Sequence, residues 1–385
     1  MIRSGIATLP LHFGAAPHWL FEKMACLSRE MITLIASEFG TEELLKRLAD
    51  PYWFQALGCV LGFDWQSSGL TTTTCAALKE GIKGLEEDLG LFICGGKGKT
   101  SRKTPQEITS WGEKLGLEPQ EFIKTSKLTA KVDNNLVQDG YQLYHHNFFF
   151  TSTGSWAVVQ QGMNQTINGG VAWARRYHWF NPPGVQKDFI EEPQSAICTE
   201  KKGFCLDLTA RQSRGVRQKI VALTDEDPGE LCGELGQIKN QLADKPSAHQ
   251  QLCIFESIRD KEVNLPSRHY ILIKDINPQK IYQILLKTYY QQPKNFLTLV
   301  KSEGVGAKTL RALTLLAELI YGEEASYEDP ARFSFAHGGK DGYPYPVNRK
   351  LYENSILFLH DAVAKAKIGR TEKIAAFHRL SQFQK

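Results

Sequence analysis

The sequence predicts an α+β protein: a mixed N-terminal domain over residues 1–265 and an all-helical C-terminal domain over residues 275–385. Two runs rich in aromatic and β-branched residues, Tyr141–Thr151 and Trp156–Asn164, are separated by turn-forming residues, which is typical of an antiparallel hairpin. Apolar residues recur at helical spacing before this hairpin and again near the C-terminus. A sub-boundary in the mixed domain is expected near residue 138, where the helical pattern ends.

Composition indicates a soluble globular protein. The chain has 385 residues, of which 42% are hydrophobic and 23% charged, and its formal net charge is +4. No run approaches about 18 apolar residues, and the first residues lack the apolar core of a signal peptide. We therefore expect a cytoplasmic protein with no membrane contact. The eight cysteines form no CxxC pair, which favours buried thiols over a zinc ribbon or a dithiol motif.

Helices are expected at the start of the mixed domain. Pro17 can occupy the first turn of a helix that runs to about Phe39. Shorter helices are expected near Glu42–Ala49 and Tyr52–Leu61, and Thr71–Thr74 begins another. The apolar stripe of the first helix is expected to consist of Leu20, Met24, Leu27, Met31 and Leu34.

A glycine-rich basic segment, GGKGKTSRK at residues 95–103, follows these helices. Its spacing is not that of a Walker loop, and it predicts a mobile basic loop in which Lys97 and Lys99 contact phosphodiesters. The next residues, TPQE, predict a capping box with proline in the first helical turn. Helical sequence continues to about Gln138, with an interruption near Gly116.

Polar side chains are frequent within the predicted hairpin. A pairing of Thr151 with Trp156 would place His146 opposite Gln161. Burying His, Asn and Gln side chains is unfavourable unless each finds a partner, so these residues require a hydrogen-bond network, a metal or a substrate. A structural network and a functional site remain alternatives at this point.

For a functional site, the candidate catalytic residues are Asp139, His145, His146 and Gln161. Asp139, His145 and His146 would bind a divalent metal ion, Mg²⁺ or Mn²⁺, with histidine as a ligand or general base. Hard cations prefer several oxygen ligands, and Asp139 is the carboxylate close in sequence. Asp64 and Asp207, which are distant in sequence, are candidates for further oxygen ligands.

The segment ARRYHW at residues 174–179 brings Arg175 and Arg176 together with a histidine and two aromatic residues. This combination suits contacts with phosphates and bases, and it equally suits an internal cation–π contact. Short strands are expected near Phe204–Leu208 and Lys219–Leu223.

The stretch LVKSEGVGAKTLRALTLLAELIYG predicts two helices joined by a tight turn at Gly304, Val305 and Gly306. The glycines permit positive φ, and the free amides of the second helix can bind phosphate. Lys308 and Arg311 on its first turn would add positive charge. The stretch resembles the helix-hairpin-helix motif, which binds nucleic-acid phosphates without reading bases. A glycine-turned pair of helices without a ligand is the alternative.

Positive charge is concentrated near this turn. Residues Lys274–Lys385 contain 17 Lys and Arg against 11 Asp and Glu, a surplus of +6, so the rest of the chain carries −2. A Gly-, Pro- and aromatic-rich loop follows at residues 329–346 and includes Lys340, another candidate for DNA contact. A surplus of this kind supports phosphate binding, although solvated helix faces would also produce it.

Three stretches together resemble one family: LYHHNFFFTSTGSWAVVQQGMN, ARRYHWF and DPARFSFAHGGKDGYPYPV. They are similar to the prokaryotic proteins grouped as domain of unknown function 763. GIATLPLHFG, FDWQSSGLTTTT and GGKGKTSRKTP extend the resemblance over nearly the whole chain. The resemblance implies a cytosolic prokaryotic protein with a role in DNA repair or processing, and it assigns no catalytic residue.

Three functions are compatible with these patterns. The first is a metal-dependent DNA nuclease, in which the glycine turn binds the duplex and the hairpin residues act on a phosphodiester. The second is a base-excision glycosylase with Lys308 as the Schiff-base lysine and Asp329 as the nearest downstream aspartate. The third is a non-enzymatic DNA-binding scaffold. All three predict salt-dependent DNA binding with weak sequence preference, and a homodimer is left open.

Overall fold

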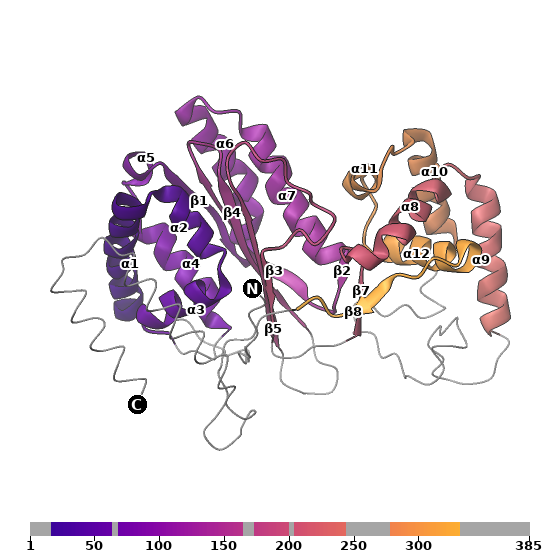
Figure 1. The fold of residues 1–385 in the computed structure, drawn as a ribbon, viewed down its shortest axis with the longest axis horizontal. Helices are drawn as coiled ribbons and strands as arrows, with labels where there is room; N and C mark the ends of the chain where they lie inside the picture. Colours follow the sequence, from indigo (N-terminus) through magenta and orange to yellow (C-terminus); the bar gives the residue numbers. More distant parts are fainter. Residues whose placement is uncertain (1–16, 64–67, 165–172, 200–203, 244–277, 332–385) are drawn as a thin grey trace, which may run out of the picture.

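The computed structural model describes residues 17–63, 68–164, 173–199, 204–243 and 278–331 (Figure 1). Helices form the first part of the chain, as the sequence predicted. They are α1 (His18–Phe39), α2 (Thr41–Leu48), α3 (Pro51–Val60), α4 (Gly69–Gly81) and α5 (Glu86–Leu89).

A five-stranded antiparallel sheet lies at the centre of the molecule, in the order β1-β3-β4-β5-β6. The predicted hairpin is confirmed as β3 and β4. The strands are β1 (Leu91–Lys97), β3 (Gln142–Thr151), β4 (Trp156–Met163), β5 (Ala174–Asn181) and β6 (Ala196–Cys198). Between β1 and β3 lie the 3-10 helix η1 (Gly98–Lys103), α6 (Thr104–Leu115), α7 (Pro119–Asn135) and β2 (Val137–Gln138).

Different helices cover the two faces of this sheet. Phe148 and Val158 belong to an apolar cluster with residues of α6 and α7, whereas Phe149 and Val159 belong to a cluster with residues of α1 to α4. Successive strand residues point to opposite faces, so this part of the hairpin contributes apolar side chains to both clusters. Figure 1 shows the helices α1–α4 on one side of the sheet and α6 and α7 on the other.

A second, three-stranded antiparallel sheet has the order β2-β7-β8. Its later strands are β7 (Phe204–Asp207) and β8 (Ser326–Glu328). The remaining helical elements are η2 (Arg211–Ser213), α8 (Arg214–Leu223), α9 (Pro228–Ala243), α10 (Pro278–Gln291), α11 (Phe296–Lys301) and α12 (Ala307–Tyr321). The α+β class is therefore correct at the level of mixed helices and antiparallel sheet.

The described part of the predicted C-terminal domain is not all helical, because it contains β8. This strand pairs with β7, which precedes the predicted boundary. Leu310 and Leu316 of α12 also belong to the same apolar cluster as Phe148 of β3. Residues on both sides of the predicted boundary thus share one sheet and one core, while residues 265–275 themselves lie outside the described residues.

The buried face of α1 differs from the predicted stripe. Leu27 and Leu34 are 41% and 61% exposed, whereas Ser28 is buried. A Cβ atom on Gly81 of α4 would lie 2.6 Å from the carbonyl oxygen of Ala25. The small residues Ala25, Ser28 and Gly81 therefore let α1 and α4 approach closely. The buried face of α1 consists of Met24, Ala25, Ser28, Ile32 and Ile35.

Three local predictions were also wrong. Residues 95–103 form the end of β1 and η1 rather than a loop, and Lys219–Leu223 belongs to α8 rather than to a strand. Glu107 does not complete a capping box: its carboxylate accepts hydrogen bonds from Gly95 N and Lys79 Nζ instead. Among the described helices, none combines the length and apolar character that crossing a membrane requires.

Candidate functional site

Ser126, His146 and Gln160 form a buried hydrogen-bonded chain between α7 and the hairpin. Ser126 Oγ lies 2.8 Å from His146 Nε2, and His146 Nδ1 lies 2.7 Å from Gln160 Oε1. Burial lowers the pKa of His146 to about 4, so its imidazole is neutral near pH 7.

Asp133 ends this chain of polar groups. Its carboxylate accepts hydrogen bonds from Gln160 Nε2, Trp179 Nε1 and Gln194 Nε2. Burial nevertheless raises the pKa of Asp133 to about 7, because desolvation outweighs the hydrogen bonds that favour the charged form.

The hairpin register differs by one residue from the prediction. His146 lies opposite Gln160, and His145 lies opposite Gln161. Thr151 N donates to the carbonyl of Ser155 within the turn, so Phe150 rather than Thr151 faces Trp156. A shift of one residue exchanges the side chains that share a face. His146 and Gln160 therefore face α7 together.

The opposite face of the hairpin contains buried polar atoms that lack hydrogen-bond partners within the described residues. These are both ring nitrogens of His145, Asn147 Oδ1 and Gln161 Oε1. Gln161 Nε2 does donate, to Tyr144 OH and to the carbonyl of Ser68. Burial lowers the pKa of His145 to about 3, so this ring is also neutral.

Asp139 and Arg175 form a buried ion pair rather than a surface site. Arg175 Nη1 lies 2.8 Å from Asp139 Oδ2, and Arg175 Nη2 lies 2.6 Å from Asp329 Oδ2. Tyr177 OH also donates to Asp139 Oδ2. The predicted phosphate contact by Arg175 is incompatible with this burial. Asp329 forms an ion pair with Arg175, so its carboxylate is not available for the predicted glycosylase role.

Arg176 is likewise fully buried. Its Nε donates to His178 Nε2, and its guanidinium lies over the ring of Phe54, 4.8 Å from the centroid. The internal cation–π alternative is therefore the one found, and the prediction that Arg176 contacts DNA is wrong.

The predicted metal ligands Asp139, His145 and His146 do not form one site. Both ring nitrogens of His146 are hydrogen-bonded, and Asp139 is held by Arg175 and Tyr177. Within the described ranges, no three His, Cys, Asp or Glu side chains gather as a metal-binding group. The proposed hairpin ligand set is therefore not supported by the geometry.

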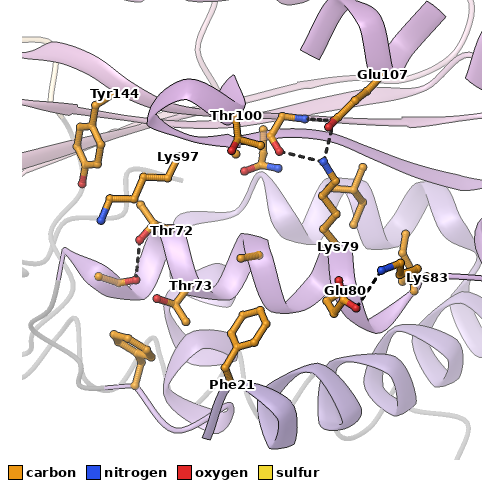
Figure 2. A pocket seen from close by; sticks show the side chains of 18 of the residues that line it. Phe21, Thr72, Thr73, Lys79, Glu80, Lys83, Lys97, Thr100, Glu107 and Tyr144 are labelled. Carbon is orange, nitrogen blue, oxygen red and sulfur yellow. Dashed lines mark hydrogen bonds and ion pairs between the residues drawn. The ribbon is translucent and has the colours of Figure 1, made fainter. Parts of the chain in front are cut away.

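A cavity of about 860 Å³ lies between α4 and the end of the sheet formed by β1 and β3 (Figure 2). Its lining includes Asn147, whose Oδ1 lacks a partner within the described residues. In Figure 2, dashed lines join Lys79 to Glu107, whereas none joins Lys97. Other lining side chains are Phe21, Thr72, Thr73, Thr100, Trp111 and Tyr144.

A smaller cavity of about 260 Å³ shares Tyr144 with the larger one. Ser126 and His146 both line it, together with His145. Its described lining residues include two cationic side chains, from Arg102 of η1 and Lys127 of α7, and no carboxylate. The hydrogen-bonded serine and histidine thus lie beside an electropositive opening.

The glycine turn has the predicted backbone form. Helices α11 and α12 flank it, Gly304 has a φ of 85°, and Val305 is buried. Lys308 is exposed on the first turn of α12, whose N-terminus has no side-chain cap.

Arg311, a further predicted DNA contact, does not lie on the exposed surface of the turn. Arg311 is buried and donates from Nε to Gln138 Oε1 at 2.7 Å, so it cannot reach a phosphate. Helical spacing places Arg311 next to Lys308, but the Arg311 side chain contacts Gln138 of β2 and is buried there. Lys340 lies outside the described residues.

Basic side chains connect the glycine turn with the two cavities. Lys131 Nζ of α7 donates to the carbonyl of Ser302 in the turn at 2.8 Å. Lys127, one helical turn away, lines the smaller cavity with Arg102, and Lys97 lines the larger one. We call this surface the basic track; it consists of Lys97, Lys99, Arg102, Lys103, Lys127, Lys131, Lys301 and Lys308. Within the described ranges, none of these residues forms an ion pair.

Sequence reasoning missed Ser126, Gln160 as a site residue, and the lysines of α7. Ser126 is a small polar residue inside a long helix, and nothing in its spacing separates it from a surface position. Only the pairing of β3 with β4 and the packing of α7 on them bring Ser126 to His146. Lys127 and Lys131 do show the four-residue spacing of one helix face.

Fold and surfaces together define an α+β protein whose central antiparallel sheet presents buried polar side chains to two cavities beside a basic surface. The chain belongs to the family described as Protein of unknown function (DUF763), whose model matches residues 5–347. This confirms the resemblance carried by the sequence motifs. Neither the curated proteins nor the solved structures contain a match to the chain.

Proposed function

We propose that this protein binds the sugar–phosphate backbone of DNA along the basic track. The observation that supports the proposal best is the hydrogen bond between Lys131 Nζ and the Ser302 carbonyl, because it joins the α7 lysines to the exposed glycine turn. Phosphates and the amide groups at the start of α12 are complementary in charge.

The ion-pair pattern favours the same surface. Lys79, Lys114 and Lys124 each form an ion pair with a glutamate carboxylate and are thereby partly neutralised. The side chains of the basic track lack such partners within the described residues and are exposed, except for half-buried Lys131. Unpaired lysines release counterions from DNA at little cost in lost protein contacts.

The test is fluorescence anisotropy with a labelled DNA duplex at several salt concentrations. Lys127→Glu combined with Lys308→Glu should weaken binding at least about tenfold at low salt. It should also make the slope of log affinity against log salt shallower by about 2, roughly one for each lost phosphate contact.

The matched control is Lys23→Glu combined with Lys46→Glu, which changes the net charge equally. These exposed residues lie on α1 and α2, on the opposite side of the sheet from α7. The control should leave the salt dependence of the affinity unchanged. It should lower the affinity only through the weaker long-range electrostatic attraction. If both double variants lost the same DNA affinity, the basic track would not be the binding surface.

A further inference from the structure

The hydrogen bonds around His146 fix which of its ring nitrogens accepts a proton. Gln160 Nε2 donates to the carbonyl of Thr129 and to Asp133, so its Oε1 must face the ring. Oε1 is only an acceptor, and His146 Nδ1 therefore holds the hydrogen. The lone pair therefore lies on Nε2, which accepts a hydrogen bond from the Ser126 hydroxyl group at 2.8 Å.

This order of groups is that of an activated nucleophile. A hydroxyl, a neutral imidazole and an acceptor that orients the imidazole lie within hydrogen-bond reach of one another. Asp133 holds the Gln160 amide in place from the other side. The chain combines α7, β3 and β4, so the packing of the helix on the sheet determines its geometry.

The smaller cavity distinguishes this chain of hydrogen bonds from an ordinary network in the core. Ser126 and His146 line the cavity rather than a packed interior.

The charge of the cavity selects the substrate class. Arg102 and Lys127 line it, and no described lining residue is acidic. A neutral ester would gain nothing from two cations, whereas a phosphodiester is anionic and gains negative charge on its non-bridging oxygens when the serine oxygen attacks.

We propose that Ser126 is a nucleophile toward phosphodiesters, with His146 as its general base and Gln160 and Asp133 as positioning residues. That the phosphodiester belongs to a DNA strand rests on the proposed function.

In the first step, Ser126 Oγ attacks phosphorus and its proton moves to His146 Nε2. The bond from phosphorus to the leaving oxygen breaks, and His146 returns the proton to that oxygen. A phosphoserine ester and a free hydroxyl result. Water then attacks phosphorus, His146 takes the water proton and passes it to Oγ, and the products are a phosphate monoester and the original serine. Neither step requires an oxidant or a further reactant.

The experiment uses the whole chain and a fluorophosphonate probe, whose P–F bond breaks when an activated serine attacks phosphorus. Tryptic mass spectrometry should locate the label on Ser126, and Ser126→Ala should abolish it. His146→Gln should slow labelling at least about a hundredfold while the melting temperature shows that the protein is folded. Ser101→Ala is the matched control, since Ser101 lines the same cavity but donates to the Gly98 carbonyl. Its labelling should equal that of the parent.

Gln160→Met tests the positioning role. It removes Oε1 but keeps the side-chain length, so labelling should slow at least about tenfold and the imidazole N–H proton resonance of His146 should shift. A packing role alone would leave both the resonance and the rate unchanged. Hydrolysis of bis(4-nitrophenyl) phosphate should follow the same ranking of variants.

The outcomes separate the two proposals. DNA binding without label on Ser126, or labelling that is equal in His146→Gln, overturns the nucleophile and leaves the basic track intact. Labelling and diester hydrolysis without DNA binding support the nucleophile and overturn DNA as its substrate.

Discussion

Asp133 is a carboxyl group buried among hydrogen-bond donors and remote from solvent, and its titration couples to folding. Burial raises its pKa to about 7 in the folded protein, whereas an unfolded aspartate titrates near about 3.9. The folded state therefore binds more protons than the unfolded state between about pH 4 and pH 7. The free energy of unfolding contributed by Asp133 falls as the pH rises through that range.

Asp133→Asn should remove this contribution. Relative to the parent, the variant should gain stability as the pH rises from about 4 to 7, by about 1.4 kcal/mol per unit of pKa difference. His145 and His146, whose pKa values are lowered, act in the opposite direction, and the difference between parent and variant cancels them.

Urea unfolding midpoints measured at intervals across this pH range provide the test. Asp225→Asn, at an exposed position after α8, controls for the substitution itself. A parent-minus-variant difference that does not change with pH would show that Asp133 stays charged when folded.

Individual residues also show where sequence reasoning reaches its limit. The spacing of Lys308 and Arg311 suggested one charged surface, yet Arg311 is buried against Gln138 because α12 packs on the end of α7. Arg175 was predicted to contact phosphate, but it forms ion pairs with Asp139 and Asp329, which lie in distant parts of the chain. Ion pairs between such segments have no signature in local sequence.

At the scale of elements, the backbone conformation at the end of β1 requires glycine at position 95. Gly95 has a φ of 94°, and a Cβ atom there would lie 2.2 Å from the carbonyl oxygen of His146 and 2.7 Å from Thr104 Oγ1. Its backbone N–H also donates to Glu107, and its carbonyl accepts from Lys79. This position joins β1, β3, α4 and α6 around the larger cavity.

Gly95→Ala should therefore destabilise the protein by about 3 kcal/mol or more, because left-handed backbone strain adds to a backbone clash. Gly98→Ala is the matched control: its φ is 59°, and apart from residue 98 and its two chain neighbours, no atom of the described residues would lie within 4 Å of the new methyl group. It should cost about 1 kcal/mol. Chemical denaturation of both variants measures the difference, and equal costs would contradict the clash.

The elements were easier to predict than their contacts. Hairpin strands, the helices before them and the glycine turn all have strong local signals, and the structure contains them. The hairpin register was wrong by one residue, because Thr151 closes the turn with Ser155. That shift determines which polar residues face α7. The Ser126–His146–Gln160 chain could therefore not be predicted from the sequence alone.

At the scale of the whole molecule, one apolar cluster connects the central sheet with the C-terminal helices. It includes Trp156 and Trp179 of the sheet, Val132 of α7, and Leu299 and Leu316 of α11 and α12. The β7–β8 pairing adds backbone hydrogen bonds between the same regions. We therefore expect these regions to unfold together rather than as the two domains that the sequence suggested.

Leu316→Ala tests this expectation. Leu316 is fully buried, so the substitution should cost about 2–5 kcal/mol. If the regions form one cooperative unit, native-state hydrogen exchange should accelerate for the slowest amides of β4 as much as for those of α12. Ile320→Ala, at a position of α12 that is 45% exposed, should leave both sets unchanged. Faster exchange confined to α12 would instead mean that the C-terminal helices open independently, and the basic track would then be divided between two separately folding parts.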